Sequence, residues 1–385
     1  MKRSQSALET VFIYGFTIAV ISLSLILLYE FGFFSPSNYT QNTVNGFTGF
    51  AVTQTCIPGG ALLLNVENTQ NVPVEITYIN ASSPGQVGAA LPYSSILQSD
   101  ESGEFFVLNA CPTAANQQYS GAAIITYVTA SQITPGPFFS NGSYFGKSAS
   151  SYSQPLVANY TNSSYIMIHN STTMYGLWHG RASNYGYTLL YWTNTLHAYS
   201  PCGSPSNACG AGIMTYQGCV GGLYKSSKNS THFEFFGYEW NGTAGCGGVN
   251  RGAEAGPTMY APYNKWQLVV VTFNFTSSGS ATETTCLDGT CASSAYTLGG
   301  TPDTYSDGST YITGTYQLNG KVADVQLYST ALSQSQIQDL YSEGYSGAPV
   351  TTNHLVAWLP LAGNANDYSG NNNNGAISSI NWVSP

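Results

Sequence analysis

The sequence has few charged residues. Only 7% of its 385 residues are charged, whereas soluble domains average roughly 25%. Nine residues are Lys or Arg and the formal net charge is −9, which argues against nucleic acid as a partner. Aromatic residues make up 14% of the chain, so most of it is not a disordered stalk. The scarcity of charge is compatible with an acidic habitat, in which carboxylates are protonated.

The sequence also lacks the motifs of common catalytic sites. No Gly-x-Ser-x-Gly elbow, His-Glu-x-x-His helix or Gly-x-Gly-x-x-Gly loop occurs, and the five His are scattered. The chain contains no Glu-x-Asp-x-x-Glu strand pattern of paired acids. Glu234 and Glu239 are five residues apart, so on one continuous strand they would face opposite sides. We therefore expect a protein without enzymatic activity.

One long apolar run lies near the N-terminus. Val11 to Leu28 contains only small polar interruptions, and a helix of that length roughly matches a bilayer core of about 30 Å. Lys2 and Arg3 precede it and the next basic residue is Lys147, which predicts a cytoplasmic N-terminus and an extracellular bulk. No Ala-x-Ala-like cleavage site follows the run. We expect a retained, single-pass membrane helix over residues 5–34.

The residues before this run carry a second signal. QSALE, residues 5–9, separates the basic leader from the apolar run and places a carboxylate where the helix enters the membrane. The segment resembles the class III signal peptide of archaeal type IV pilin-like proteins, although Ser4 stands where that family usually has Gly or Ala. The resemblance implies that a prepilin-type peptidase removes leader residues 1–4, cutting between Ser4 and Gln5.

The same resemblance gives Glu9 a role in assembly. A carboxylate entering an apolar bundle is costly unless it is paired, and the new α-amino group at Gln5 of a neighbouring subunit would pair with it. Self-assembly through the N-terminal helix, and a surface filament, follow from this interpretation. The alternative is a plain signal anchor in which Glu9 lies at the headgroup level near a helix N-terminus, where the helix dipole favours it.

All eight Cys follow the apolar run. An even number of Cys in an oxidising compartment predicts disulfides. Cys286 and Cys291 flank an Asp288-Gly289 turn that sets them opposite each other in a hairpin. Cys56 and Cys111 bracket one domain and are expected to tie its sheets together. The remaining Cys lie in Gly-rich loops, where we expect the pairs Cys202–Cys209 and Cys219–Cys246. Zinc is the alternative, but no Cys-x-x-Cys or His-x-x-x-His spacing accompanies them.

Nine Asn-x-Ser/Thr triplets predict glycosylation on the extracellular side, although such triplets also arise by chance. They begin at Asn38, Asn80, Asn141, Asn159, Asn162, Asn170, Asn229, Asn241 and Asn274.

Short alternating strands with turn signals follow a polar linker, residues 35–45. Their spacing of about eight to twelve residues, without a helical period, predicts a small immunoglobulin-like β-sandwich over residues 46–130. The Pro- and Gly-containing segment SQITPGPFF, residues 131–139, is then a linker to a second domain.

The second domain, residues 140–385, has the more specific sequence. GKVADVQLYSTALSQSQIQDLY combines a strand, an Ala331-Leu332 turn and a short helix for which Ser333 is the expected N-cap and Ile337 and Leu340 the apolar face. This stretch resembles the closing segment of LamG-like, concanavalin A-like jelly rolls. The expected fold class is therefore mainly β, with an N-terminal transmembrane helix, a small sandwich and a larger jelly roll.

The last segment departs from that family's order. HLVAWLPLAGNANDYSGNNNNGA resembles the segment that normally opens a LamG domain, yet here it comes last. We expect residues 354–383 to return to their own sandwich, as in a circular permutation. Donation of the strand to a neighbouring subunit is the alternative.

The LamG-like resemblance implies a carbohydrate or protein binder, often with calcium at its rim. Asp324 and Asp367 match the family's acidic positions, and oxygen ligands suit calcium. The alternative for Asp367 is an Asx-turn that only shapes its loop. Trp178, Tyr238 and Trp240, in predicted loops, are weaker candidates for stacking on sugars.

Three functions remain from the sequence. The first is a membrane-anchored, pilin-like protein of the cell surface that displays a lectin-like jelly roll for surface glycans. The second is a structural envelope or filament subunit that contacts neighbouring envelope proteins and binds no free ligand. The third, a glycoside hydrolase of concanavalin-like fold, is disfavoured by the missing acid pair.

Overall fold

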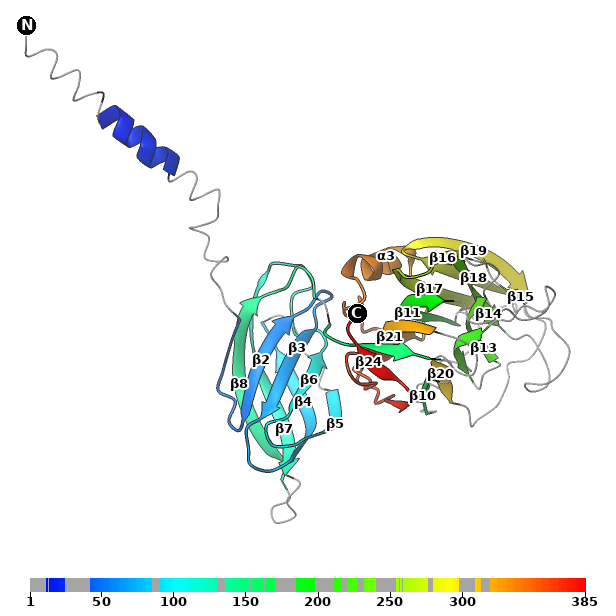
Figure 1. The fold of residues 1–385 in the computed structure, drawn as a ribbon, viewed down its shortest axis with the longest axis horizontal. Coiled ribbons are helices and arrows are strands. Elements are labelled where there is room, and N and C mark those ends of the chain that lie inside the picture. The colour runs from blue at the N-terminus through cyan, green and yellow to red at the C-terminus, as the bar shows by residue number, and fades with distance from the viewer. Residues whose placement is uncertain are drawn as a thin grey trace, which may run out of the picture.

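The structure is a computed structural model of the full chain. It describes residues 12, 14–24, 42–84, 91–129, 136–152, 154–161, 164–169, 185–197, 211–216, 220–226, 232–239, 254–255, 257, 259–275, 280–297, 309–312 and 319–385. Within these residues the protein is mainly β, and every strand pair is antiparallel. Two β-sandwiches follow one another along the chain (Figure 1).

The first sandwich has a five-stranded and a three-stranded sheet. The larger sheet has the order β1 (Thr43–Asn45), β8 (Phe138–Lys147), β7 (Gln118–Thr129), β4 (Val74–Ser82) and β5 (Leu91–Leu97). The smaller sheet has the order β2 (Phe50–Cys56), β3 (Leu62–Asn68) and β6 (Ser102–Val107). Their strands alternate buried and exposed residues, as expected for sheets with one face in water.

The boundary of this sandwich differs from the prediction. β8 pairs with β7 from Gln118↔Lys147 to Tyr127↔Phe138, so the first sandwich extends to Lys147 rather than ending at residue 130. Thr43–Asn45, assigned to the linker, pairs with β8. Pro and Gly mark a connection between two strands of one sheet as readily as a linker between domains, and SQITPGPFF leads directly into β8.

The second sandwich has two eight-stranded sheets. One has the order β15 (Glu254–Ala255), β14 (His232–Glu239), β13 (Val220–Ser226), β12 (Ala211–Tyr216), β20 (Thr310–Ile312), β10 (Tyr165–Ile168) and β23 (Gly375–Ser378), and β16 (Met259–Pro262) also pairs with β14. The other has the order β19 (Thr290–Thr297), β18 (Ser280–Leu287), β17 (Trp266–Phe275), β11 (Tyr185–His197), β21 (Asn319–Tyr328), β9 (Val157–Tyr160) and β24 (Asn381–Val383), and β22 (Leu355–Leu359) also pairs with β21.

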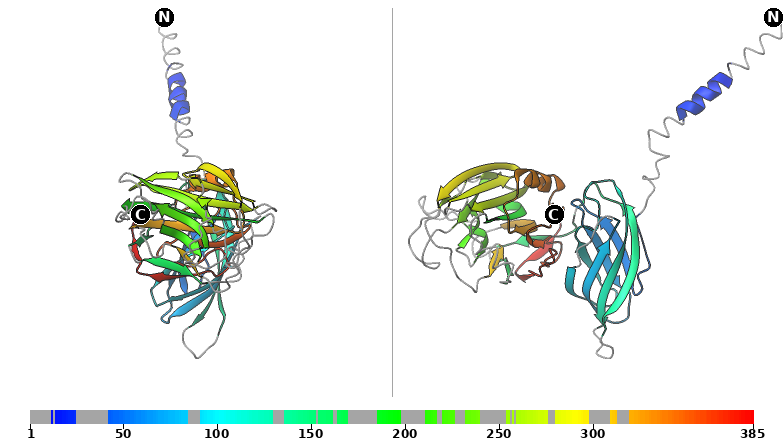
Figure 2. Two further views of the ribbon diagram at one scale, coloured as in Figure 1. Left: turned by 90° about the vertical axis from the view of Figure 1, so that its right-hand side faces the viewer. Right: turned by 180° about the vertical axis from the view of Figure 1, so that it is seen from behind.

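Helix α3 (Gln334–Glu343) packs on the outer face of the second of these sheets, where Ile337 and Leu340 share a cluster with Leu268 and Val270. Figure 2 shows the helix at the end of this sandwich that is nearest the first one. Ser333 is its N-cap and forms a capping box with Gln336, and Ile337 and Leu340 are its buried residues. The cap and the apolar face are those predicted from the sequence. The middle of β17, LVVV, is apolar at every position because both of its faces are buried: Leu268 and Val270 lie in the core cluster beneath α3, whereas Val269 and Val271 lie in the core between the sheets.

The C-terminal segment pairs within its own chain. β22 pairs with β21, β23 with β10 and β24 with β9, so both sheets contain strands from it. In Figure 1 the red end of the chain, with β24, lies on the side of the second sandwich that faces the first.

The predicted N-terminal helix is only partly within the described residues. Phe12 and residues 14–24 are helical, whereas residues 5–11, 13 and 25–34 of the prediction lie outside the part of the chain that the structure describes. In the described part, no helix has both the length and the apolar character that a membrane crossing requires.

Removing the C-terminal segment tests its place in the fold. A chain that ends at Tyr345 loses β22, β23 and β24 together with the buried Trp358 and Tyr368, so we expect insoluble or protease-sensitive protein. The control ends at Ser379 and loses only β24, whose residues are exposed or half-buried. We expect the control to retain the circular dichroism spectrum and protease resistance of the full chain. Equal behaviour of the two shortened chains would contradict this arrangement.

Candidate functional site

Asp324 lies at an irregularity in β21. The pairing of β21 with β11 shifts register here, and Asp324 takes a left-handed conformation with φ 48°, which Asp tolerates better than most residues. Its backbone N–H donates to the Pro360 carbonyl at 3.0 Å. The carboxylate accepts hydrogen bonds from Gln326 of the same strand and from Trp358 of β22.

The Asp324 carboxylate is the acceptor of a buried polar chain. Gln326 Nε2 donates to both oxygens at 2.9 Å, and Trp358 Nε1 donates to Oδ1 at 2.8 Å. Tyr328 in turn donates its hydroxyl to Gln326 Oε1 at 2.6 Å. Burial raises the pKa of Asp324 to about 7, although the hydrogen bonds from Gln326 and Trp358 oppose this shift.

Asp367 organises the loop after β22. Its Oδ1 accepts from the backbone N–H groups of Trp358 (2.9 Å) and Ser369 (2.8 Å), and its Oδ2 accepts from the Ser369 hydroxyl (2.9 Å) and the Asn373 N–H (2.7 Å). Burial raises its pKa, and these four hydrogen bonds oppose the shift. The bond from Ser369 N–H is that of an Asx-turn, one of the two interpretations left open by the sequence.

These two carboxylates do not fit calcium. Calcium takes six to eight oxygen ligands, whereas the groups that surround Asp324 and Asp367 are N–H and O–H donors already bonded to the carboxylates. Among the described residues, no group of three or more His, Cys, Asp or Glu could hold a metal ion. Both residues therefore act as buried anchors for Trp358, which the sequence argument had not singled out.

Trp358 also connects the two sandwiches. Its ring and that of Tyr368 pack edge-on against Phe106 of β6, with centroid distances of 5.3 and 5.0 Å. Tyr368 donates its hydroxyl to the Glu104 carbonyl at 3.1 Å. These aromatic residues belong to one buried cluster that continues from the core of the first sandwich to the residues beneath α3.

Hydrogen bonds strengthen the same contact. Ala348 N–H donates to the Pro58 carbonyl at 3.0 Å, and Asn109 Nδ2 donates to the Thr352 hydroxyl at 3.1 Å. The Glu343 carboxylate lies beside the turn at Gly59, where an added Cβ would lie 2.9 Å from its Oε2. Burial, together with the charges of Asp324 and Asp339, raises the pKa of Glu343 to about 8.

The predicted sugar-stacking residues are not brought together in the described part of the chain. Trp178 and Trp240 lie outside the described residues. Tyr238, expected in a loop, is instead in strand β14, opposite Gly222 and Ala255. The strand pattern HFEFFGYE extends through Tyr238, and this explains the difference.

Two predicted disulfides are present, Cys56–Cys111 and Cys286–Cys291. Asp288 and Gly289 both have positive φ, as the predicted hairpin turn requires. Cys202, Cys209, Cys219 and Cys246 lie outside the described residues, as do Ser4, Gln5 and Glu9.

Four acceptor asparagines are described. Asn80, Asn141 and Asn274 are exposed on strands, and Asn159 is half-buried in β9. The other acceptors lie outside the described residues: Asn38, Asn162, Asn170, Asn229 and Asn241.

Asp324 and Glu343, whose pKa values are raised to about 7 and about 8, predict a stability that depends on pH. Each binds a proton more tightly in the folded than in the unfolded chain, so its stabilising contribution is complete below about pH 4 and is lost as pH rises to about 7 for Asp324 and about 8 for Glu343. We expect Tm to be higher at pH 5 than at pH 8.5 by roughly 5 °C.

Substitution of Asp324 and Glu343 tests whether these two groups cause the pH dependence of Tm. Asp324→Asn and Glu343→Gln should each flatten the dependence of Tm on pH between 5 and 8.5, because neither replacement titrates. Asp100→Asn, at an exposed position of the first sandwich, is the matched control and should leave the slope unchanged. Differential scanning fluorimetry between pH 5 and 8.5 measures this slope of Tm against pH. A slope that survives both buried substitutions would rule out these groups as its source.

Comparisons with known proteins agree with part of the prediction. Residues 161–338 match a laminin-G-type family model, Laminin_G_3, described as the Concanavalin A-like lectin/glucanases superfamily. No curated protein matches the sequence. One solved structure that resembles the chain is that of "a putative carbohydrate binding protein from Bacteroides ovatus ATCC 8483", with a TM-score of 0.42, 14% identity, and coverage of 88% of this chain and 94% of that one. By the family match, the second sandwich contains a concanavalin A-like domain at residues 161–338.

Proposed function

We propose that this protein is a membrane-anchored protein of the cell surface that displays a carbohydrate-binding jelly roll. The observation that carries the proposal is the match of residues 161–338 to the Concanavalin A-like lectin/glucanases superfamily. Lectins bind carbohydrates and glucanases cleave them, so carbohydrate is the ligand class that both named branches share. The antiparallel two-sheet sandwich formed by this part of the chain agrees with that match.

The anchor in this proposal is the N-terminal segment. Its described helical residues expose large apolar side chains, with Phe12 at 75%, Phe16 at 68% and Ile18 at 64% exposure. Such side chains are stable when they are buried in lipid or against the same helix of other subunits. The flanking apolar sequence extends the run to the length of a bilayer core. Cleavage before Gln5 and pairing of Glu9 in a pilin-like assembly belong to the same proposal.

The positions of the described carboxylates favour a protein that binds carbohydrate without cleaving it. β14 continues from His232 to Glu239 with no shift in its pairing to β13, so Glu234 and Glu239 occupy opposite-parity positions of one strand. Asp324 and Asp367 are 2% and 5% exposed and are held by hydrogen bonds inside the fold. A retaining or inverting glycosidase needs two accessible carboxyl groups about 5–10 Å apart.

A glycan array with the full chain in detergent tests the proposal. We expect retention on a restricted set of glycans, and we expect EDTA to leave it unchanged, because Asp324 and Asp367 do not fit calcium. A soluble form of the bound glycan should compete, and mass spectrometry of that glycan after incubation should show no cleavage.

Three outcomes would overturn parts of this account. If no glycan is retained, the protein is better described as a structural envelope subunit. If EDTA abolishes binding, calcium is held elsewhere in the chain. If the glycan is cleaved, the protein is a glycoside hydrolase.

A further inference from the structure

A groove crosses the outer face of the five-stranded sheet of the first sandwich. It consists of two adjoining hollows with volumes of about 660 and 480 Å³. Both are lined by Ser83, Pro84, Ser120 and Phe145, so they form one continuous depression. Pockets that hold small ligands usually have volumes of about 300–1,000 Å³. We call this depression the sheet groove.

The strand register places the floor of the sheet groove in two rows. Thr43, Phe145 and Ser120 lie opposite one another on β1, β8 and β7. In the neighbouring row Asn45, Ser143, Ala122 and Ser82 lie on β1, β8, β7 and β4. Because the sheet is antiparallel and side chains alternate, all of these face the same side.

The side chains that line the sheet groove are uncharged. Among the described residues, no Asp, Glu, Lys or Arg lines either hollow; Lys147 lies opposite Gln118, which lines the second hollow. Hydroxyl and amide groups surround one exposed ring, that of Phe145, which is 37% exposed, whereas the lining rings of Tyr119 and Tyr144 are buried. The small side chain of Ala122 leaves the middle of the floor open. An ionic ligand would find no counter-charge among the lining residues, whereas a sugar presents hydroxyls to the polar rows and an apolar face to the ring.

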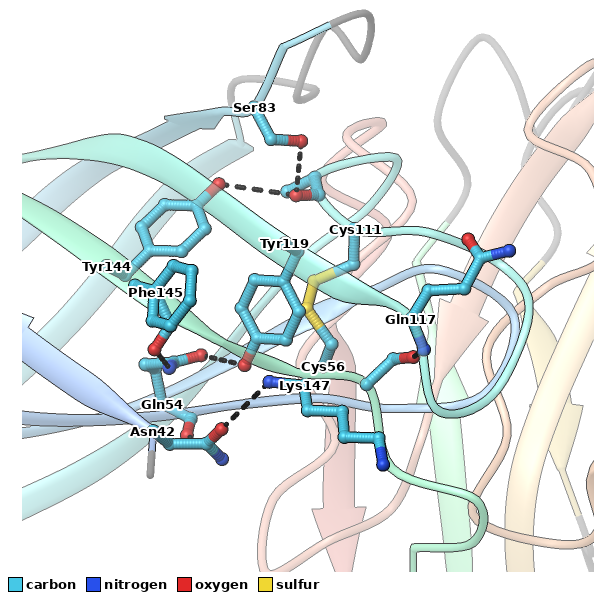
Figure 3. Close-up of a disulfide and its surroundings, with 12 residues drawn as sticks. Asn42, Gln54, Cys56, Ser83, Cys111, Gln117, Tyr119, Tyr144, Phe145 and Lys147 are labelled. Atoms are coloured by element: carbon cyan, nitrogen blue, oxygen red, sulfur yellow. Dashed lines mark hydrogen bonds between the residues drawn. A yellow bond between two sulfur atoms is a disulfide. The ribbon is translucent and has the colours of Figure 1, made fainter. Parts of the chain in front are cut away.

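The floor is held in place from below (Figure 3). Gln54 Nε2 donates to the Phe145 carbonyl at 3.0 Å, and the hydroxyl of Tyr119 donates to Gln54 Oε1. Tyr144 and Ser83 both donate to the Ala110 carbonyl, at 3.2 and 3.0 Å, next to the Cys56–Cys111 disulfide.

A glycine completes this support. A Cβ at Gly121 would overlap the ring of Tyr144 and the carbonyl of Ser82, so glycine is required at this position. A preformed floor of this kind reduces the entropy lost on binding.

We propose that the sheet groove binds an uncharged oligosaccharide. The site is separate from the domain at residues 161–338 and therefore goes beyond the function proposed above. Two acceptor asparagines flank it: Asn80 and Asn141 lie in the row next to its floor, on either side of Ile124. The serines of their triplets, Ser82 and Ser143, line the groove itself. The test therefore uses protein from a host that does not attach N-glycans.

Filling the groove is the direct test. Ala122→Arg adds a long side chain to an exposed position of the floor, whereas Ile124→Arg adds the same side chain two residues along the same strand and face, outside the lining. Calorimetric titration of the full chain in detergent with uncharged oligosaccharides, chosen from the glycan array, should show at least a tenfold weaker affinity at one site in Ala122→Arg. Ile124→Arg should stay within twofold of the unmodified chain.

A second pair of variants tests the ring. Phe145→Ala should weaken the same binding about tenfold and Phe145→Trp should restore it. Phe139→Ala, on the same strand and face and 64% exposed, should have no effect. Tm of each variant, measured first, shows that the sandwich is folded.

The outcomes separate this proposal from the previous one. Oligosaccharide binding that Ala122→Arg leaves unchanged overturns the sheet groove and leaves the domain at residues 161–338 as the binding site. Absence of all oligosaccharide binding overturns both proposals. Self-association in sedimentation experiments that Ala122→Arg abolishes, with no sugar bound, would identify the groove as a contact between copies of this chain.

Discussion

Trp358 is the residue on which the described structure depends most. Its indole N–H donates to Asp324, its backbone N–H to Asp367, and its ring packs against Phe106 of the other sandwich. The two carboxylates fix the indole in place, and the ring connects the two cores into one cluster. Because Trp358 lies in β22, the final part of the chain is what closes the second sandwich and attaches it to the first.

Two of the few carboxylates in this chain are buried and have a structural role. Asp324 and Asp367 are 2% and 5% exposed, beside the aromatic cluster that joins the two sandwiches, where N–H donors replace water. Isolated buried carboxylates are costly, and burial raises the pKa of both. Their position favours a protein that is most stable in mild acid, in agreement with the scarcity of surface charge. The family-like positions of the two acids thus have a structural role in this chain.

The sequence predicted correctly those features whose defining residues lie close together along the chain. The Ser333 cap, the Asp288-Gly289 hairpin and the LamG-like domain are of this kind. The end of the first sandwich was predicted wrongly, because SQITPGPFF has the composition of a linker while connecting two paired strands. The sheet groove could not be predicted, since Thr43, Phe145 and Ser120 meet only through the register of three strands distant in sequence.

The central claim is that the shared aromatic cluster makes the two sandwiches one folding unit. Differential scanning calorimetry of the full chain tests it most directly. The account predicts one unfolding transition whose calorimetric and van't Hoff enthalpies agree. It also predicts that Phe106→Ala, which removes a ring packed on Trp358 and Tyr368, splits or broadens that transition. Two separate transitions in the unmodified chain, each unaffected by Phe106→Ala, would contradict it.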